Sequence, residues 1–558
     1  MPGFLLSGPV AALVVAQGCP RKSLCDESAG FVPPGFAHYQ KELGMGGSRR
    51  WLTLVIVSAA LFLVVIDMTV LYTALPSLAQ ALQTTASEKL WILNAYSLGM
   101  AGLMPVFGAL GDRLGQRRVF VFGMLAFGAA SLLAAFAPSA RVLILARALL
   151  AIGGAAMIPA TVALIRLTFH DPKEQALAIG IWGSIASGGA AVGPLLGGFL
   201  LEHFWWGSVF LINVPVIAVA VTSTLLLVPA YPGQSSQPID GLSCVQSTVG
   251  MVALAFGIKE FAQPEPSLAL AAGALGLGVL GLTVFVRRQL RLPFPLVDLR
   301  ILGTPQIATG ILVALVASLT LIGFELALSQ RLQLVLEKSP LAAGAFVLPV
   351  SLGSFIAGPL AGFVIGRIGV LRVLLAGLLM TVLGLASYVL LRDGAVGLQI
   401  IALALCGVGV GSSLTASGSL VISHVSAERA GMAGSLEGVA FEFGGALGVT
   451  LFGSLMTGVY LAVLRGSDYA VAAGSSLDEA HLAAQGMAQG QAMLAFAKQA
   501  FETGFNAVSL AAAAGLLMLT LWISLRRKRI VSEGSLISNK KPAIRRALVS
   551  RAGLRPCR

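Results

Sequence analysis

The sequence predicts an all-α integral membrane protein with fourteen transmembrane helices. Of its 558 residues, 57% are hydrophobic and only 11% are charged, whereas a soluble globular chain carries roughly a quarter charged residues. Long apolar runs recur along the chain, and arginines and lysines gather in the short turns between them and in the last 33 residues. These observations argue against a soluble enzyme, a disordered scaffold and, despite a net charge of +13, a nucleic-acid-binding protein.

Each transmembrane helix needs about 20 apolar residues to cross the hydrocarbon core. Runs of this kind predict spans at 52–75, 90–110, 118–137, 142–165, 176–200, 207–229, 243–261, 267–287, 305–328, 340–364, 371–391, 397–422, 431–462 and 504–525. Turn-forming residues separate the runs, as at Pro76-Ser77 and Tyr231-Pro232-Gly233. The thirteenth run exceeds one crossing, so we expect it to tilt or to project beyond the bilayer.

The distribution of basic residues predicts the orientation of the chain. With both termini inside, 18 arginines and lysines flanking the spans fall on the cytoplasmic side and 8 on the other, which is the bias that sets membrane topology. We therefore expect a multi-pass protein with both termini in the cytoplasm. Residues 1–44 hold only a short apolar stretch and precede Met45, so we expect a disordered tail or an upstream start there.

The loop after the second span combines glycines, an acid and arginines. It contains Gly108, Asp112, Arg113, Gly115, Arg117 and Arg118. The glycines permit a tight turn and close helix packing, while Asp112 can pair with arginines or cap a neighbouring helix, in a contact that breaks when two halves rock apart. The same arginines also fit a simpler role, in which their positive charge keeps this loop on the cytoplasmic side of the membrane. A weaker echo at 358–369 has Gly362 where Asp112 would align, which indicates an internal repeat.

Two further spans carry distinctive residues. Arg147, in the fourth span, cannot lose its proton and needs a partner or a water-filled cavity, so it either gates a nearby acid or forms a fixed ion pair. The fifth span holds Gly189, Gly193, Pro194, Gly197 and Gly198. Glycines four residues apart allow close packing of helices, and proline allows a bend. The alternative is an ordinary helix–helix contact made by small residues.

These motifs resemble those of the major facilitator superfamily: its loop after the second helix, its arginine motif and the fifth-span motif of its exporters. Asp67–Pro76, Trp91, Tyr96 and Phe210–Pro215 extend the similarity to the fourteen-helix drug:proton antiporter family of the QacA and SmvA type. The resemblance covers about Ser48 to Lys528. Tyr72 departs from the asparagine common there.

The resemblance implies the major facilitator fold, with two six-helix bundles and two inserted helices. The corresponding segments are a cytoplasmic tail at 1–50, bundles at 51–229 and 305–525, the inserted pair at 243–287, an extracytoplasmic loop at 463–503 and a basic tail at 526–558. It also implies proton-coupled export of lipophilic, mostly cationic compounds by alternating access across a bacterial plasma (inner) membrane, by a monomer. A proton-coupled exporter of an endogenous metabolite, such as an amino acid or siderophore, is the alternative on the same fold.

Five acids lie within the predicted spans. Glu260 is at the outer end of the span 243–261, where we expect an interfacial pair with Lys259. The other four are candidates for function, namely Asp67, Glu325, Glu437 and Glu442. A charge at the bilayer centre costs several kcal/mol, which makes such acids functional candidates. Burial raises the pKa of a carboxyl group, so it can hold a proton in one conformation and release it in another. The same carboxylate can bind a lipophilic cation, so proton and drug would compete for it.

Asp67 is the first candidate for proton coupling, because it lies past the middle of its span and matches the family's first-helix acid. Glu442 lies deep in the thirteenth span, where the resemblance also places an acid. Glu437 is about 140° away from Glu442 around the helix and nearer its cytoplasmic end. Glu325 is near the outer end of its span, so a position at the membrane interface is as consistent with the sequence as a functional role. For Asp67 and Glu442 the alternative is a structural hydrogen bond or helix–helix tie.

Ser354 takes the place of a further tenth-span acid of QacA-type pumps, which argues for weaker handling of divalent cations. The five cysteines are far apart, and no HExxH, GxSxG or Walker A sequence occurs, so we expect no enzyme activity, no metal and no cofactor.

Overall fold

The computed structural model describes residues 47–169, 171–230, 240–261, 266–293, 295, 298–425, 430–467, 469–470, 472–484 and 490–551. The expectation for residues 1–44 lies outside this part of the chain. The chain divides into two units after Trp51. The helix packing described here is that of the second unit, Leu52–Arg558.

Among the described residues, the first half of the chain and the segment after it form nine helices. They are α2 (Gly47–Leu82), α3 (Ala86–Leu114), α4 (Gln116–Ala135), α5 (Ala140–Thr168), α6 (Pro172–His203), α7 (Ser208–Leu211), α8 (Asn213–Leu227), α9 (Gly241–Glu260) and α10 (Leu268–Arg291). The remaining helices are η1 (Leu299–Gly303), α11 (Pro305–Gln330), η2 (Arg331–Val335), α12 (Pro340–Ile368), α13 (Val370–Leu391), α14 (Val396–Ser423), α15 (Ala430–Leu464), α16 (Leu477–Ala484) and α17 (Gly490–Arg551).

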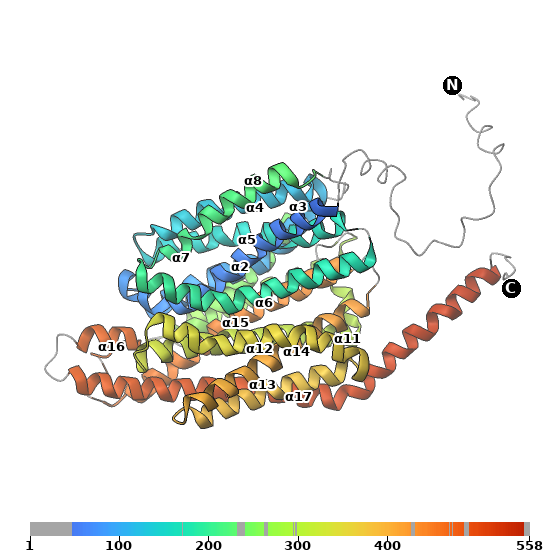
Figure 1. Ribbon diagram of the computed structural model, residues 1–558. Helices are drawn as coiled ribbons and strands as arrows, with labels where there is room; N and C mark the ends of the chain where they lie inside the picture. Colours follow the sequence, from blue (N-terminus) through green and yellow to red (C-terminus); the bar gives the residue numbers. More distant parts are fainter. Residues whose placement is uncertain are drawn as a thin grey trace, which may run out of the picture. The chain divides into compact units, whose positions relative to one another are not determined.

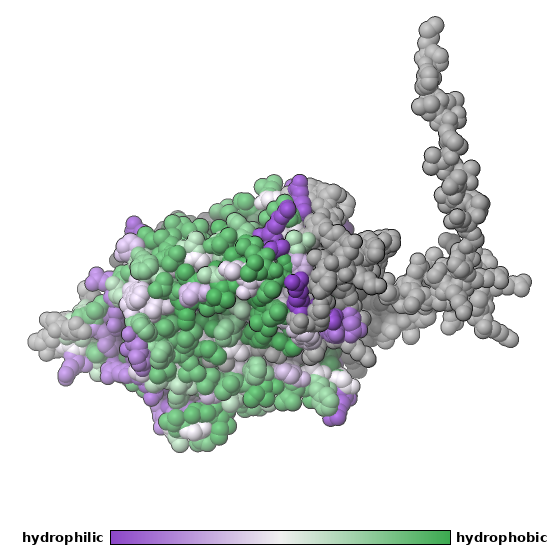
Figure 2. Space-filling view, turned by 45° about the horizontal axis from the view of Figure 1, so that its top comes forward, coloured by the Kyte–Doolittle hydropathy of each residue, from purple (hydrophilic) through white to green (hydrophobic). Residues whose placement is uncertain are grey.

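A helix coincides with each of the predicted spans, although 207–229 is divided between α7 and α8. Among the described residues, 13 helices are long and apolar enough to cross a membrane. Helix α6, which contains the predicted span 176–200, is not one of them, so a fourteenth crossing stays a prediction. Figure 2 shows apolar side chains in a broad band over the visible face, with hydrophilic residues toward its two ends, as expected for a protein surrounded by lipid.

The helices pack in groups that follow the chain (Figure 1). In the N-terminal half, α5 packs on α3 and α4, and α4 packs on α8; in the C-terminal half, α14 packs on α12 and α13, while α17 packs on α11, α13 and α15. The halves meet where α6 contacts α12 and α3 contacts α15. Helices α9 and α10 pair with each other, and α9 contacts both α3 and α15, so the inserted pair lies against both halves.

Glycine hinges of the same shape link α3 to α4 and α12 to α13. Gly115 has φ 96° and ψ 129°, and Gly369 has φ 89° and ψ 149°; this positive φ is favourable only for glycine. In both cases the glycine N–H donates to the carbonyl four residues earlier. The internal repeat predicted from the sequence is therefore present in the structure.

The hinges correct the alignment of the two loops. Superposing Gly369 on Gly115 matches Pro359 with Pro105, which lie ten residues before the respective hinges and inside their helices. Gly366, rather than Gly362, then stands opposite Asp112. The predicted match of Gly362 with Asp112 is therefore wrong by four residues, since the shared backbone conformation of the two hinges fixes the register.

The helix at the end of the chain begins before the predicted span 504–525. Within the predicted loop 463–503, α16 forms at Leu477–Ala484 and α17 starts at Gly490. Alanine-rich sequence favours helix, and this extension buries one face, which consists of Met493, Ala497, Ala500, Phe501 and Phe505. The added turns therefore pack against protein rather than forming an irregular loop.

Candidate functional site

A buried ion pair occupies the interior of the N-terminal half. Arg147 Nη1 on α5 pairs with Asp67 Oδ2 on α2, and the two side chains are 2% and 0% exposed. Asn213 on α8 donates from Nδ2 to Asp67 Oδ1 at 3.2 Å and to Ser131 Oγ at 3.1 Å. Both carboxylate oxygens of Asp67 are thus engaged. The structure therefore contains an ion pair between Arg147 and Asp67, one of the two roles expected for Arg147 beside the gating of a nearby acid.

Aromatic rings and backbone complete the surroundings of Arg147. Its Nε donates to Ile92 O at 3.2 Å, and its guanidinium carbon lies 4.3 Å from the centroid of the Tyr96 ring and 5.9 Å from that of Phe210. Desolvated cation–π contacts of this kind contribute up to about 2 kcal/mol. The motifs around Asp67, Tyr96, Arg147 and Asn213, which are far apart in sequence, therefore form one network.

Glu442 lies at the contact between the two halves. Its side chain on α15 is buried, and Ser97 of α3 lies close to its carboxylate. The carboxylate oxygen Oε2 is buried and has no hydrogen-bond partner among the described residues. An unsatisfied buried acceptor is costly, so this oxygen is suited to carry a proton or to face a cation.

The other two acids lie apart from Glu442. Glu437, one and a half turns earlier on α15, is partly buried and accepts a hydrogen bond from Ser417 Oγ of α14 at 3.1 Å. Glu442 and Glu437 therefore contact different helices, as their angular separation predicts. Glu325 on α11 is partly buried and lies within electrostatic range of Tyr72 and Cys406, so it faces other helices rather than only the bilayer surface.

Asp112 lies in the last turn of α3, directly before the Gly115 hinge. Asp112 Oδ1 accepts a hydrogen bond from Gln116 Nε2 at 2.8 Å, across the Gly115 hinge, and no arginine pairs with it among the described residues. Arg117 donates to Leu225 O of α8 at 2.6 Å, while Arg113 and Arg118 are exposed. Arginine pairing and helix capping were both open for Asp112 from the sequence; in this conformation its carboxylate instead accepts from the side chain of Gln116, the first residue of α4.

The small residues of α6 lie between α2 and α12. On one side, a Cβ at Gly189 would lie 3.1 Å from Phe62, and one at Gly197 would lie 3.2 Å from Val70 O; Gly193 lies against Thr69. On the other side, a Cβ at Gly198 would lie 2.6 Å from Leu341 N, and one at Gly344 would lie 2.7 Å from the carbonyl carbon of Pro194. The motif therefore lets the two halves approach backbone to backbone.

Polar contacts join the halves at the end where α2 finishes and α3 begins, which is the predicted extracytoplasmic end. Ser329 Oγ donates to Tyr72 O at 2.9 Å, and Gln333 Nε2 donates to Thr73 O at 3.0 Å. Lys89 of α3 pairs with Asp478 of α16. These contacts close that end of the molecule.

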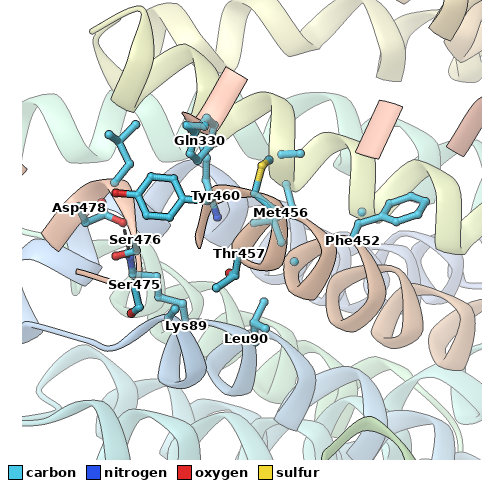
Figure 3. Close-up of a pocket in the computed structure, with 17 residues that line it drawn as sticks. Lys89, Leu90, Gln330, Phe452, Met456, Thr457, Tyr460, Ser475, Ser476 and Asp478 are labelled. Atoms are coloured by element: carbon cyan, nitrogen blue, oxygen red, sulfur yellow. Dashed lines mark hydrogen bonds and ion pairs between the residues drawn. The ribbon is translucent and has the colours of Figure 1, made fainter. Parts of the chain in front are cut away.

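A cavity of about 50 Å³ lies beside the Lys89–Asp478 pair. Figure 3 shows Lys89, Ser476 and Asp478 on one side of it and Phe452, Met456 and Tyr460 along α15. Lys89 also donates to Ser476 Oγ at 3.3 Å, and both members of the ion pair are about nine-tenths buried. The segment before α17 thus reaches across the C-terminal half to the N-terminal half.

Several partners were not identified from the sequence as site residues. Ser97, Ser131 and Asp478 are not themselves motif residues, and only their contacts reveal them. Asn213 offered a signal, because an amide inside an apolar run needs a buried partner.

The chain is similar to a known protein family and to named relatives over most of its length. The family model described as Major Facilitator Superfamily matches residues 57–449. The chain is 40% identical over 494 residues to the methyl viologen resistance protein SmvA of Salmonella typhimurium, covering 86% of this chain and 99% of that protein. It is 38% identical over 414 residues to the multidrug efflux pump LfrA of Mycolicibacterium smegmatis, covering 74% and 82%.

Solved structures share the fold at low sequence identity. A bacterial homologue of the human lysosomal transporter Spinster, in an inward-facing and unoccupied conformation, has a TM-score of 0.62 at 17% identity, over 85% of this chain and 98% of that chain. The peptide transporter POT has a TM-score of 0.54 at 14% identity, over 85% and 95%. The chain therefore belongs to the Major Facilitator Superfamily, as a multi-pass membrane transporter of the drug:proton antiporter type and not an enzyme.

Proposed function

We propose that the protein is a proton-coupled multidrug efflux antiporter that exports lipophilic, mostly cationic compounds, such as quaternary ammonium antiseptics and dyes, by alternating access. The names of the relatives, methyl viologen resistance protein and multidrug efflux pump, support this substrate class. They favour it over export of an endogenous metabolite.

The observation that carries the proposal is the unpartnered carboxylate oxygen of Glu442. Asp67, the first candidate from the sequence, is compensated by Arg147 and Asn213, so a cation would have to displace an existing partner there. Glu442 has one free oxygen and lies between α15 and α3, the helices of opposite halves that must separate during transport. We therefore assign to Glu442 the exchange of proton for drug.

The other candidate residues receive supporting roles in this proposal. Asp67 and Arg147 hold the helices of the N-terminal half together as one rigid body. Glu437 and Glu325 attract protons or pass them on. Asp112 and Gly115 form the hinge at which α3 and α4 change their relative angle. The α6 glycines carry the sliding contact with α12. The protein works as a monomer in a bacterial inner membrane, with both termini in the cytoplasm, so that the closed end faces outward.

Efflux from energised cells tests this assignment. Cells expressing wild type, Glu442→Gln, Asp67→Asn and the control Asp393→Asn would be loaded with ethidium, a monocation, or methyl viologen, a dication, with and without a protonophore. Asp393 is a suitable control because its side chain is 82% exposed. Membrane expression and melting temperature of each variant would be measured in parallel.

We expect protonophore-sensitive efflux from wild type and Asp393→Asn. Efflux by Glu442→Gln should fall at least about tenfold, because the variant loses the charge that would pair with the bound drug cation, and removing one partner of a buried charge pair weakens binding on this scale or more. Full efflux by Glu442→Gln would contradict its assignment. Efflux of neither cation by well-expressed wild type would contradict the multidrug function and favour the metabolite exporter.

A further inference from the structure

The inserted helices α9 and α10 form a groove that has no part in the proposed transport mechanism. The groove has a volume of about 380 Å³, within the range of small-ligand sites, about 300–1,000 Å³. It is lined by Gln246, Val284, Arg287, Arg288, Arg291 and Leu292. It lies where α10 ends and α9 begins, which is the predicted cytoplasmic end of the pair.

The groove carries excess positive charge. Arg288 makes hydrogen bonds of 3.1 Å from Nε and Nη2 to the two carboxylate oxygens of Asp240. Partial burial raises the pKa of Asp240, but the hydrogen bonds from Arg288 and Ser243 outweigh this and lower it below its ordinary value, so Asp240 stays ionised and neutralises Arg288. Arg287 and Arg291 are exposed, and no described acid pairs with them. Two guanidinium groups one helical turn apart are therefore available to an anion.

An apolar stripe leads directly to these arginines. Leu277, Leu280 and Val284 precede Arg287 and Arg291 at spacings of three and four residues, which place all five on one side of α10. The three apolar side chains are 53%, 61% and 41% exposed. Only 11% of the α10 span is buried inside the protein, so this side of the helix faces lipid.

The opposite wall of the groove offers an unmatched polar group. Gln246 on α9 has a side-chain oxygen, Oε1, that is buried without a hydrogen-bond partner among the described residues. This acceptor needs a hydrogen-bond donor, which a hydroxyl group of a ligand can supply and an acyl chain cannot.

We propose that this groove binds an anionic phospholipid of the cytoplasmic leaflet. Arg287 and Arg291 bind the phosphate, for which the guanidinium group is well suited, and one acyl chain lies along Leu277, Leu280 and Val284. Basic pockets between transmembrane helices on the cytoplasmic side have the chemistry of such headgroup sites. A soluble anion would use only the arginines, whereas a lipid uses the charge and the continuous apolar stripe together.

Lipid binding to the purified, full-length protein tests this proposal independently of efflux. Native mass spectrometry in detergent would count lipids retained after addition of dioleoyl-phosphatidylglycerol or the zwitterionic dioleoyl-phosphatidylethanolamine. The variant is Arg287→Gln/Arg291→Gln. The matched control is Arg367→Gln/Arg372→Gln, which removes the same charge from the α12–α13 connection; melting temperatures would confirm that both fold.

We expect wild type and the control to prefer phosphatidylglycerol, and the groove variant to bind it about 10- to 30-fold more weakly, since each arginine near an anionic surface contributes about 1 kcal/mol. Glycerol phosphate, which lacks acyl chains, should not compete. Equal retention by the groove variant and wild type, or displacement by glycerol phosphate at the concentration of the lipid, would overturn the proposal. Equal loss in the control would do so too, because it would indicate diffuse charge attraction.

Discussion

Asp67 and Arg147 are a charge pair that needs both members. Each side chain is almost fully removed from solvent. Removing one partner of such a buried ion pair lowers the stability of the folded protein by about 3–5 kcal/mol, because the other charge stays buried without compensation. Asn213 and Tyr96 satisfy further contacts of the pair but carry no charge. A substitution at Asp67 therefore changes folding as well as any proton chemistry, whereas one at Glu442 removes a carboxylate that lacks a charged partner.

We accordingly expect Asp67→Asn to lower the free energy of unfolding by about 3–5 kcal/mol, and Glu442→Gln to leave it nearly unchanged. The measurement is the melting temperature of the purified variants in detergent. The double variant Asp67→Asn/Arg147→Gln serves as the control, since it removes both charges and should recover part of the loss. Equal stability of Asp67→Asn and wild type would show that the ion pair contributes little.

At the scale of helices, the α6–α12 contact depends on the absence of side chains. Gly198 lies against the backbone of Leu341 and Gly344 against that of Pro194, so the helices touch at two points one turn apart on α6. Backbone atoms cannot move aside as a flexible side chain can, and added methyl groups must separate the helices.

Gly198→Ala should therefore destabilise the closed conformation by about 1–3 kcal/mol, the usual cost of overpacking. The expected result is a lower melting temperature together with slower ethidium efflux. Gly366→Ala, on α12, is the matched control, because a Cβ there would meet no atom within 4 Å. If both variants behave like wild type, the close approach of α6 and α12 is not required.

For the molecule as a whole, the Lys89–Asp478 pair links the two halves at the closed end. Opening that end must separate two charges that are about nine-tenths buried. We expect Lys89→Ala to favour the open conformation and to increase the reaction of a Gln330→Cys probe with a membrane-impermeant maleimide, since Gln330 lines the adjoining cavity. The charge swap Lys89→Asp/Asp478→Lys should restore slow labelling. Unchanged labelling in Lys89→Ala would contradict a role in closure.

Much of this architecture followed from the sequence, because a membrane imposes simple rules of length and charge. The helix positions could be inferred from the apolar runs and the family from the resemblance of its motifs, while Asp67, Arg147 and Glu442 stood out as candidates because they are charges within apolar runs. Which acid pairs with Arg147 could not, since it depends on how α2, α5 and α8 pack. The partners Ser97 and Asp478 were also out of reach, because polar residues of this kind are common and only tertiary packing selects among them.

The compensation of Asp67 by Arg147 also has an electrical consequence. A neutral pair moves through the transmembrane field at no net cost, so the charge carried in each cycle is set by the exchanged proton and the drug. Under our assignment to Glu442, one proton exchanged for a monocation is electroneutral. Export of a dication against one proton moves a positive charge outward, which an inside-negative potential opposes by about 2.3 kcal/mol per 100 mV. Membrane voltage should therefore slow the export of methyl viologen but leave that of ethidium unchanged.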